Sequence, residues 1–236
     1  MKPLIYKRIT MTLIINKFDY SPISRKQING KRLYETPDGQ AVASVTTILD
    51  ATKDKTHLIA WKKRVGEKKA QEIVTEAASV GTRMHSYLEK YIETAEWPQP
   101  GSNPYAQQAH SMAEVIKENA LADVDQIWGS EIALYMPNMY AGTTDLVGQY
   151  KGQPAIMDFK QSNKPKKEEW VFDYFLQLVA YAEAHNEIYG TNICEGHVFM
   201  CTRDCEYQQF DIWPDEYPEW RQEWYDRLYR YYEQHG

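Results

Sequence analysis

Hydrophobic and polar residues follow two different periods along this chain, and the change between them marks the expected elements. Alternating or short continuous apolar segments predict strands at about 126 to 135, 140 to 150, 153 to 160, 193 to 201 and 206 to 212. Apolar positions spaced by three and four predict helices over 57 to 78, 82 to 94, 105 to 121, 168 to 189 and 218 to 234. Val80-Gly81 is expected to separate the first helix from the second.

The front of the chain predicts a small hairpin followed by a capped helix. Pro37-Asp38-Gly39 has turn chemistry, so the short segments on either side of it are expected to pair. Ser44 can cap a short helix that ends near Asp50. The order helix, three strands, helix, strand indicates an α/β fold in which a mixed central sheet is flanked by helices. We expect one domain, made of an N-terminal arm and hairpin (1–43), a basic helical segment (44–78) and a core (79–236).

Two aspartates and a lysine are expected to meet in the predicted hairpin of residues 140 to 160. Lys151-Gly152 is a two-residue connection of the kind that closes tight hairpins. Strands in register across this turn put Asp145 directly opposite Asp158, with their Cβ atoms about 5 Å apart. Like charges so placed repel unless one is protonated or a cation lies between them. Lys160 points to the same face because strand side chains alternate, so these residues predict a metal site with a charged helper.

Composition narrows the class of protein. The chain has 236 residues, of which 43% are hydrophobic, and this suits one domain with a full core. No run of 18 apolar residues is present, so no membrane-spanning helix is expected. The apolar run at 11 to 16 is too short for a signal-peptide core, and no long, basic, acid-poor presequence precedes it. We therefore expect a cytoplasmic protein of a bacterium or a phage-infected host cell.

The net charge of -6 conceals an uneven distribution along the chain. Residues 1 to 90 carry a net charge of +8, and residues 91 to 236 carry -14. A basic front half could contact a polyanion while the acidic half holds a divalent metal ion. The basic residues between 62 and 69 could equally form only the solvated face of a helix, and the charge pattern alone favours neither interpretation.

Four short motifs occur in one order along the chain: Gly81-Thr-Arg-Met-His85, Gly142-Thr-Thr-Asp145, Asp158-Phe-Lys160 and Gln177-Leu-Val-Ala-Tyr181. On these residues the chain resembles the RecB-like branch of the PD-(D/E)XK nuclease superfamily, whose G-x-x-x-H, acidic strand, D/E-x-K and Q-x-x-x-Y elements come in that order. The resemblance covers about residues 42 to 232 and is greatest to the group of the mitochondrial genome maintenance exonuclease and its phage relatives. A lone D-x-K would be a weak signal, but four motifs in order are specific.

The resemblance implies hydrolysis of phosphodiester bonds with the help of a divalent ion. Carboxylate oxygens of Asp145 and Asp158 are hard ligands that suit Mg²⁺ or Mn²⁺. By the resemblance, the imidazole of His85 and the main-chain carbonyl of Phe159 complete the ligand set. Lys160 is then expected to orient the attacking water and to stabilise negative charge in the transition state.

Other candidate residues carry weaker signals. Glu131 could support the metal or a second ion, or it could simply be exposed on its strand. Gln177 and Tyr181 are implied by the resemblance to position the lysine or the DNA strand, although a tyrosine at this spacing is ordinarily part of the core. Candidate DNA contacts, chosen by charge or position, are Lys62, Lys63, Arg64, Lys68, Lys69, Arg83, Ser162, Lys164 and Lys166. Trp220, Trp224, Leu228 and Tyr231 have helical spacing and are expected in the core.

An iron–sulfur cluster is not expected. RecB-like nucleases that carry one hold it with one early and three late cysteines, whereas Cys194, Cys201 and Cys205 are all late in this chain. His197 with two of these cysteines has the residue types of a zinc site, but alternation along a strand would scatter them. Buried thiols are the expected outcome.

The sequence therefore predicts a metal-dependent DNA exonuclease that prefers single-stranded DNA with a free end. By the resemblance, the cationic segment 57 to 78 would form a helical arch through which the strand passes. Two alternatives stay open: a phage recombination exonuclease or structure-specific endonuclease that acts on duplex DNA, and a catalytically silent nucleic-acid-binding module. The repelling acids weigh against the silent module, because binding alone does not need them. The polarity of digestion and the oligomeric state are not predicted.

Overall fold

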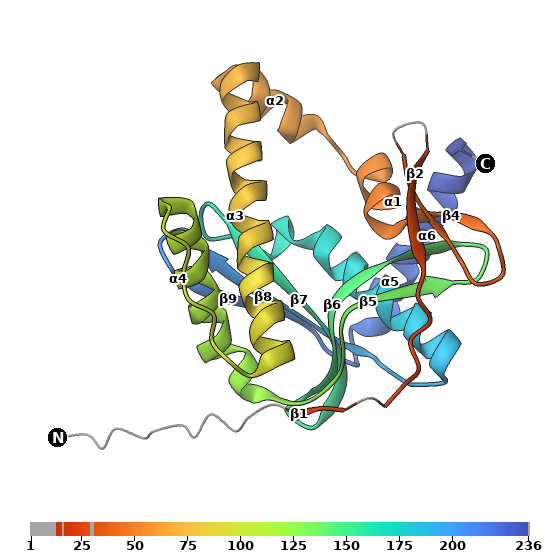
Figure 1. The fold of residues 1–236 in the computed structure, drawn as a ribbon. Helices are drawn as coiled ribbons and strands as arrows, with labels where there is room; N and C mark the ends of the chain where they lie inside the picture. The colour runs from red at the N-terminus through yellow and green to blue at the C-terminus, as the bar shows by residue number, and fades with distance from the viewer. Residues whose placement is uncertain (1–12, 16, 29–30, 236) are drawn as a thin grey trace.

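The computed structural model describes residues 13–15, 17–28 and 31–235 (Figure 1). Its centre is a nine-stranded sheet in which the strands follow the order β2-β3-β4-β6-β7-β8-β9, while β5 pairs with both β6 and β1. The pairs β1–β5, β4–β6 and β7–β8 are parallel, so the sheet is mixed. The strands are β1 (Leu13–Ile14), β2 (Ser24–Ile28), β3 (Lys31–Glu35), β4 (Ala41–Ser44), β5 (Val124–Met136), β6 (Tyr140–Tyr150), β7 (Gln153–Ser162), β8 (Glu195–Thr202) and β9 (Tyr207–Ile212).

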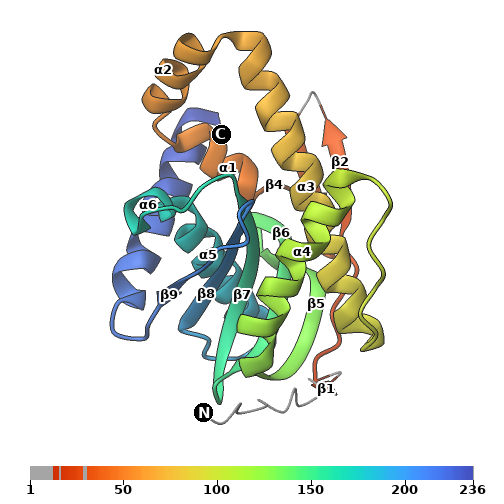
Figure 2. The ribbon, with the colours of Figure 1, turned by 90° about the vertical axis from the view of Figure 1, so that its left-hand side faces the viewer.

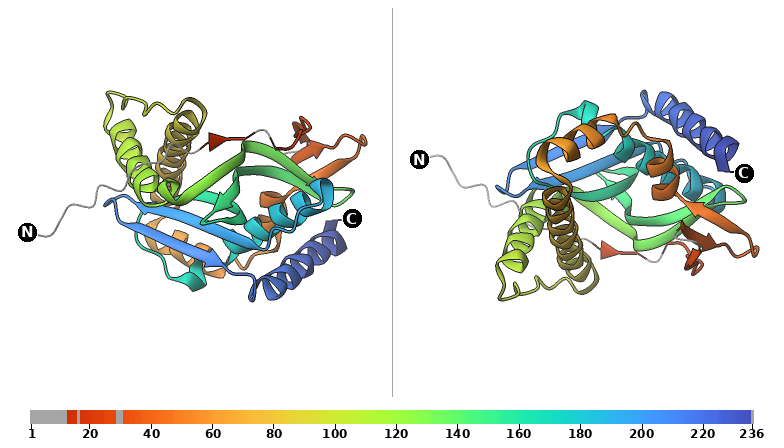
Figure 3. Two further views of the ribbon diagram at one scale, coloured as in Figure 1. Left: turned by 90° about the horizontal axis from the view of Figure 1, so that it is seen from below. Right: turned by 90° about the horizontal axis from the view of Figure 1, so that it is seen from above.

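Helices cover both faces of the sheet, as Figures 2 and 3 show. Helices α3 and α4 lie against one face, and α1, α5 and α6 lie against the other. The α-helices are α1 (Val45–Thr52), α2 (Thr56–Val65), α3 (Glu67–Thr94), α4 (Pro104–Asn119), α5 (Phe172–Tyr189) and α6 (Tyr217–His235), with short 3₁₀ helices η1 (Leu121–Asp123) and η2 (Glu168–Trp170). The predicted α/β class, a mixed sheet flanked by helices, is confirmed.

Two hydrophobic clusters form the main core, one on each face of the sheet. Neighbouring residues of β7 divide between them, because Ile156 packs under α5 and α6 while Met157 packs under α3 and α4. Trp224, Leu228 and Tyr231 of α6 are buried, as their spacing predicted. This two-sided burial fixes the register of β7 and thereby the directions of the acidic and basic side chains at its end.

The hairpin and the capped helix that were predicted for the front of the chain are both present. Strands β3 and β4 pair around the predicted turn, and the side chain of Ser44 accepts a hydrogen bond from the Thr47 N–H at 3.0 Å. Lys151 and Gly152, between β6 and β7, have φ values of 49° and 84°, as a two-residue hairpin turn of the primed type requires. Strands β1 and β2 were not predicted. No helix of the described residues has the length and apolarity to cross a membrane.

The predicted break between helices at Val80-Gly81 is wrong. Helix α3 runs through both residues, and α2 meets α3 at Gly66, where φ is 86°. Burial explains the difference, because Val80 begins an apolar stripe that continues through Met84 and Leu88 against the sheet. The packing of this stripe outweighs the low helix propensity of one glycine.

Gly148 of β6 provides a test of the core packing. A Cβ at this position would lie 2.0 Å from the main-chain oxygen of Gln126, where β5 has an irregular register. Neither backbone can yield without breaking the ladder, so Gly148→Ala should lower the free energy of unfolding by about 1–3 kcal/mol. Urea denaturation measures this change, with Gln149→Ala on the same strand as the control. Equal stability of the two variants would contradict the close approach.

Candidate metal centre and active site

Strands β6 and β7 separate at the point where the acidic residues begin. Their ladder keeps the predicted register from the turn as far as the pair Leu146–Met157, and no further pair follows. The predicted register is therefore confirmed, but the ladder ends one pair before Asp145 and Asp158, so their expected direct pairing is not formed. Instead, the Oδ2 atom of Asp145 accepts a hydrogen bond from the Phe159 N–H at 2.7 Å, so its carboxylate occupies the gap between the strands. This gap makes room for a site that a continuous ladder would close.

Asp158 and Lys160 point toward helix α5. The Lys160 ammonium forms an ion pair with Oδ2 of Asp158 and donates to Oε1 of Gln177 at 3.3 Å. Gln177 in turn donates from Nε2 to the hydroxyl of Tyr181 at 3.4 Å. Gln177 thus contacts the lysine directly, and Tyr181, one turn further along α5, holds Gln177 in place.

Close packing fixes Tyr181, the last residue in the series of contacts from Lys160 through Gln177. The ring of Tyr181 lies over Gly142, where a Cβ would be 2.8 Å from the tyrosine hydroxyl. Tyr181 is 2% exposed, so it has little room to move. The Gly142-Thr-Thr-Asp145 motif therefore begins with glycine because a side chain there would displace the tyrosine that supports Gln177.

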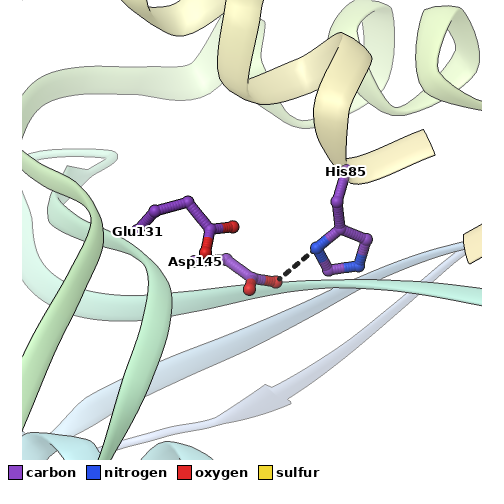
Figure 4. Close-up of side chains that lie close together, drawn as sticks. All are labelled: His85, Glu131 and Asp145. Atoms are coloured by element: carbon purple, nitrogen blue, oxygen red, sulfur yellow. Dashed lines mark ion pairs between the residues drawn. The ribbon is translucent and has the colours of Figure 1, made fainter. Parts of the chain in front are cut away.

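A second group of side chains gathers on the other side of Asp145 (Figure 4). His85 comes from α3, Glu131 from β5 and Asp145 from β6, and one ligand atom of each lies within 4.8 Å of the others. The Nδ1 atom of His85 is 3.5 Å from Oδ2 of Asp145. Asp145 is 13% exposed at its side chain and is common to both groups, so it is the centre of the candidate site.

Glu131 reaches this group because its backbone is distorted. The ladder of β5 and β6 continues on both sides of it, with Ser130 opposite Leu146 and Ile132 opposite Thr144, so Glu131 falls opposite Asp145. Its φ is 50°, in the left-handed region that non-glycine residues rarely adopt. A strained residue in a regular strand, turned toward a second carboxylate, is a typical feature of a functional site.

The acidic groups have pKa values that reflect crowding of negative charge. Burial raises the pKa of Asp158 to about 6, and the charge of Asp145 adds to this effect against the opposing charge of Lys160. Burial, and then Asp145, raise the pKa of Glu131 to about 7. Burial acts upward on the pKa of Asp145 too, but the charges of His85 and Lys160 outweigh it and lower that pKa. Asp145 therefore ionises at lower pH than usual, whereas Asp158 and Glu131 keep their protons to higher pH than usual.

The pKa values of the two basic groups are governed by the neighbouring carboxylates rather than by burial. Burial disfavours the charged forms of His85 and Lys160, yet the pKa of each is raised, because Asp145 outweighs burial for the histidine and Asp158 does so for the lysine. The site thus lowers its negative charge with protons in the absence of an ion. A divalent cation can take the place of those protons.

The donor set fits a hard divalent ion. Carboxylate oxygens predominate, which suits Mg²⁺ or Mn²⁺, and one imidazole nitrogen favours Mn²⁺ somewhat. Asp158 lies outside the tightest group of ligand atoms because it pairs with Lys160. Phe159 approaches through its main chain, whose N–H is bound to Asp145; coordination by its carbonyl stays a prediction.

The candidate DNA contacts come from α2, from α3 and from the end of β7 with the loop that follows it. Lys62, Lys63 and Arg64 form the last turn of α2, and Lys68 and Lys69 follow in the first turns of α3. Arg83 is exposed on α3. Ser162 is buried at the end of β7 and donates to the main-chain oxygen of Lys164 at 2.7 Å. The structure brings none of them into contact with the three clustered ligands.

Two features of the site were not predicted from the sequence: the contact of Tyr174 with Lys160 and the backbone conformation of Glu131. Tyr174, whose ring lies 5.1 Å from the Lys160 ammonium, was not considered. Its position three residues before Gln177 on a predicted helix was the available signal. Glu131 was considered, but its closeness to His85 depends on a backbone distortion that no sequence pattern marks. Among the cysteines, Cys201 is buried as expected, and burial raises the pKa of its thiol to about 12, whereas Cys194 and Cys205 are only partly buried, contrary to the expectation.

The strain at Glu131 can be tested with a pair of variants. Glu131→Gly relieves the left-handed backbone, whereas Glu131→Ala keeps it, and both remove the same carboxylate. Without metal, we expect the glycine variant to be more stable in urea by about 1 kcal/mol. Mn²⁺ titration should show equal losses of affinity in the two. A more stable alanine variant, which is the usual order inside a strand, would contradict the distortion.

Comparison with known proteins adds independent information. No protein-family model matches the chain. It is 27% identical over 174 residues to the human mitochondrial genome maintenance exonuclease 1, a match that covers 69% of this chain and 50% of the relative. The same protein from mouse is 27% identical over 70% of this chain and 51% of its own. The chain therefore spans about half the length of the curated relatives that it matches.

A third curated relative and a solved structure complete the comparison. The frog Xenopus tropicalis protein of the same name is 27% identical over 69% of this chain and 49% of its own. The crystal structure of a candidate exonuclease from Eubacterium rectale has a TM-score of 0.48 and 16% identity over 66% of this chain and 67% of that one, which is too low to assign a function. These curated relatives are vertebrate proteins named as mitochondrial, so they give no support to the expected bacterial or phage setting. By sequence the chain is similar to the vertebrate mitochondrial genome maintenance exonucleases, and this similarity supports its assignment to a nuclease family.

Proposed function

We propose that this protein is a divalent-metal-dependent exonuclease that hydrolyses single-stranded DNA from a free end. The observation that supports it most is the convergence of Asp145 with His85 and Glu131 on one side and with Asp158 and Lys160 on the other. Crowded carboxylates of this kind favour bound cations. An ammonium beside them suits chemistry on a phosphate, in which negative charge grows in the transition state.

In the proposed reaction, Asp145 and His85 hold the ion together with Glu131 and Asp158. The ion would supply charge neutralisation at the scissile phosphate and a lower pKa for the attacking water. Asp145 is suited to be the central ligand, because its lowered pKa keeps it ionised across the neutral range. Glu131 and Asp158 lose their protons more easily once a cation is present, so metal affinity should rise with pH.

In this proposal Lys160 is a positively charged hydrogen-bond donor and does not act as a general base. Its raised pKa keeps the ammonium charged at neutral pH. Of its three N–H donors, Asp158 and Gln177 take two, which leaves one for a water molecule or a phosphate oxygen. The row Gln177–Tyr181 limits the movement of this ammonium, as precise orientation of an attacking water requires.

The preference for a single strand rests on the helices α2 and α3. Helix α2 and the N-terminal part of α3 project beyond the sheet in Figure 1, and α2 has no buried residue, so it is not held as a core helix. Within the described residues no ion pair involves Lys62, Lys63, Arg64 or Lys68, which leaves four cations for phosphates. We propose that this segment is the arch over the strand, appended to a single catalytic domain, and that Arg83, Ser162, Lys164 and Lys166 contact the backbone nearer the centre.

The catalytic assignment is tested by incubating labelled single-stranded, duplex and closed circular single-stranded DNA with Mg²⁺ or Mn²⁺. Asp158→Asn and Lys160→Met should each reduce cleavage of the linear single strand by at least about a hundredfold. Asp215→Asn and Lys90→Met, which change exposed residues elsewhere, are the matched controls and should keep full activity.

Each substrate separates one alternative from the proposal. Cleavage of the closed circle would indicate an endonuclease, and faster degradation of duplex DNA would indicate a recombination-type exonuclease. Strand binding without cleavage by the unaltered protein would indicate a silent binding module. Full activity of Asp158→Asn would refute the site itself.

The pKa values give a second test, in the stability of the metal-free protein. The folded protein holds protons on Asp158 up to about 6 and on Glu131 up to about 7, above their ordinary values of 3.8 and 4.5. The folded state therefore binds more protons than the unfolded state in this window, so these two groups lower the free energy of unfolding as pH rises through it. In thermal denaturation, the melting temperature should fall less with rising pH for Asp158→Asn than for the unaltered protein. Mn²⁺ should raise the melting temperature of the unaltered protein most at a pH above the pKa of Glu131. Stabilisation by Mn²⁺ that is independent of pH would contradict the exchange of protons for the ion.

A further inference from the structure

A pocket of about 840 Å³ lies outside the catalytic centre, between the start of α2 and the start of α5. His57 of α2 lines one side, and Trp170 of η2 and Phe172 of α5 line the other. Trp170 is 58% exposed, although tryptophan is usually well covered in folded proteins. The Nζ atom of Lys167 lies 5.5 Å from the centre of its ring. An indole face that is open to solvent beside a cation is able to stack on another flat ring.

This pocket is linked to the catalytic lysine through one short helical segment. Tyr174 follows Trp170 by four residues, and its N–H donates to the Val171 main-chain oxygen at 2.8 Å. The ring of Tyr174 lies 5.1 Å from the Lys160 ammonium. Gln177, one turn further along, binds the same ammonium. Trp170 therefore precedes by four residues the tyrosine whose ring contacts the Lys160 ammonium.

The charges around the pocket are largely paired with one another. Asp173 accepts from Arg227 at 2.6 Å, and Glu169 lies 3.8 Å from Lys167. Lys53 is 2.7 Å from Asp50. Paired charges leave little net attraction for a phosphate, so the open aromatic surface is better matched to a neutral heterocyclic ring than to an anion.

The segment that precedes Trp170 is held in place at two positions. Gln208 of β9 accepts from the Lys166 N–H at 2.8 Å and donates to the Lys166 main-chain oxygen at 2.9 Å. Ser162 donates to the main-chain oxygen of Lys164 at 2.7 Å. A fixed loop loses little conformational entropy when a ligand binds, which favours a preorganised platform. No ion pair of the described residues involves Lys164 or Lys166, so both ammonium groups are available to flanking phosphates.

We propose that Trp170 is a stacking platform for one unpaired nucleobase of the DNA strand, a few nucleotides from the phosphate that is cleaved. This inference rests on the proposed function, and it deepens that function by explaining a preference for single strands. A base in a duplex has both faces covered by its neighbours and cannot lie flat on the indole, whereas an unstacked base can. Lys164 and Lys166 bind the phosphates between this base and the catalytic centre.

The test uses fluorescence anisotropy of the whole 236-residue chain with a labelled single-stranded oligonucleotide in EDTA, which prevents cleavage. Trp170→Ala should weaken binding at least about fivefold, and Trp170→Phe should restore most of the loss. Tyr229→Ala on α6, which removes an aromatic ring that is 63% exposed, is the matched control and should bind normally. A series of oligonucleotides with one abasic nucleotide locates the stacked base: one position should lose affinity for the unaltered protein but not for Trp170→Ala.

The outcomes separate this inference from the proposed function. If the unaltered protein binds and cleaves single strands, and Trp170→Ala binds them equally well, only the stacking platform is refuted. If every abasic position weakens both proteins to the same extent, the indole does not contact a base and the inference also fails. If the unaltered protein neither binds nor cleaves single strands, the platform and the proposed function fail together.

Discussion

Repulsion between carboxylates at the split between β6 and β7 is the constraint on which the candidate site depends. Asp145 fills the gap between the strands, with Glu131 opposite it on β5 and Asp158 beyond it on β7. Asp158 is buried, Asp145 is largely buried and Glu131 is exposed, and protons, an imidazolium and an ammonium reduce the negative charge of these three acids. The arrangement is therefore poised to exchange these protons for a divalent cation.

The rest of the fold holds the partners of those acids in position. The apolar stripe of α3 packs on the sheet and carries His85 to Asp145, while α5 packs on the opposite face and carries Gln177 to Lys160. Because the two helices lie on different faces, the imidazole and the ammonium approach the carboxylates from opposite sides of the sheet. The open gap between the strands is what allows them to meet there.

Local signals in the sequence were sufficient for much of this architecture. The two-residue turn at Lys151-Gly152 set the register of β6 and β7, and the motif spacing brought His85, Lys160 and Gln177 to the same region. The register alone could not foresee that the ladder ends at Leu146–Met157, because strand separation depends on competition between a ladder hydrogen bond and the one that Asp145 takes from Phe159. The left-handed backbone of Glu131 was equally hidden, since strain of this kind is supported by the surrounding structure and not by the residue itself.

The central claim is that a divalent ion binds at Asp145, in the gap between β6 and β7. Crystals grown with Mn²⁺ and measured at a wavelength that gives a strong anomalous signal for manganese would locate the ion directly. The account predicts a peak within about 2.5 Å of a carboxylate oxygen of Asp145, with His85 and at least one of Glu131 and Asp158 as further ligands. A peak elsewhere, with Asp145 still bound only to Phe159 and His85, would contradict it.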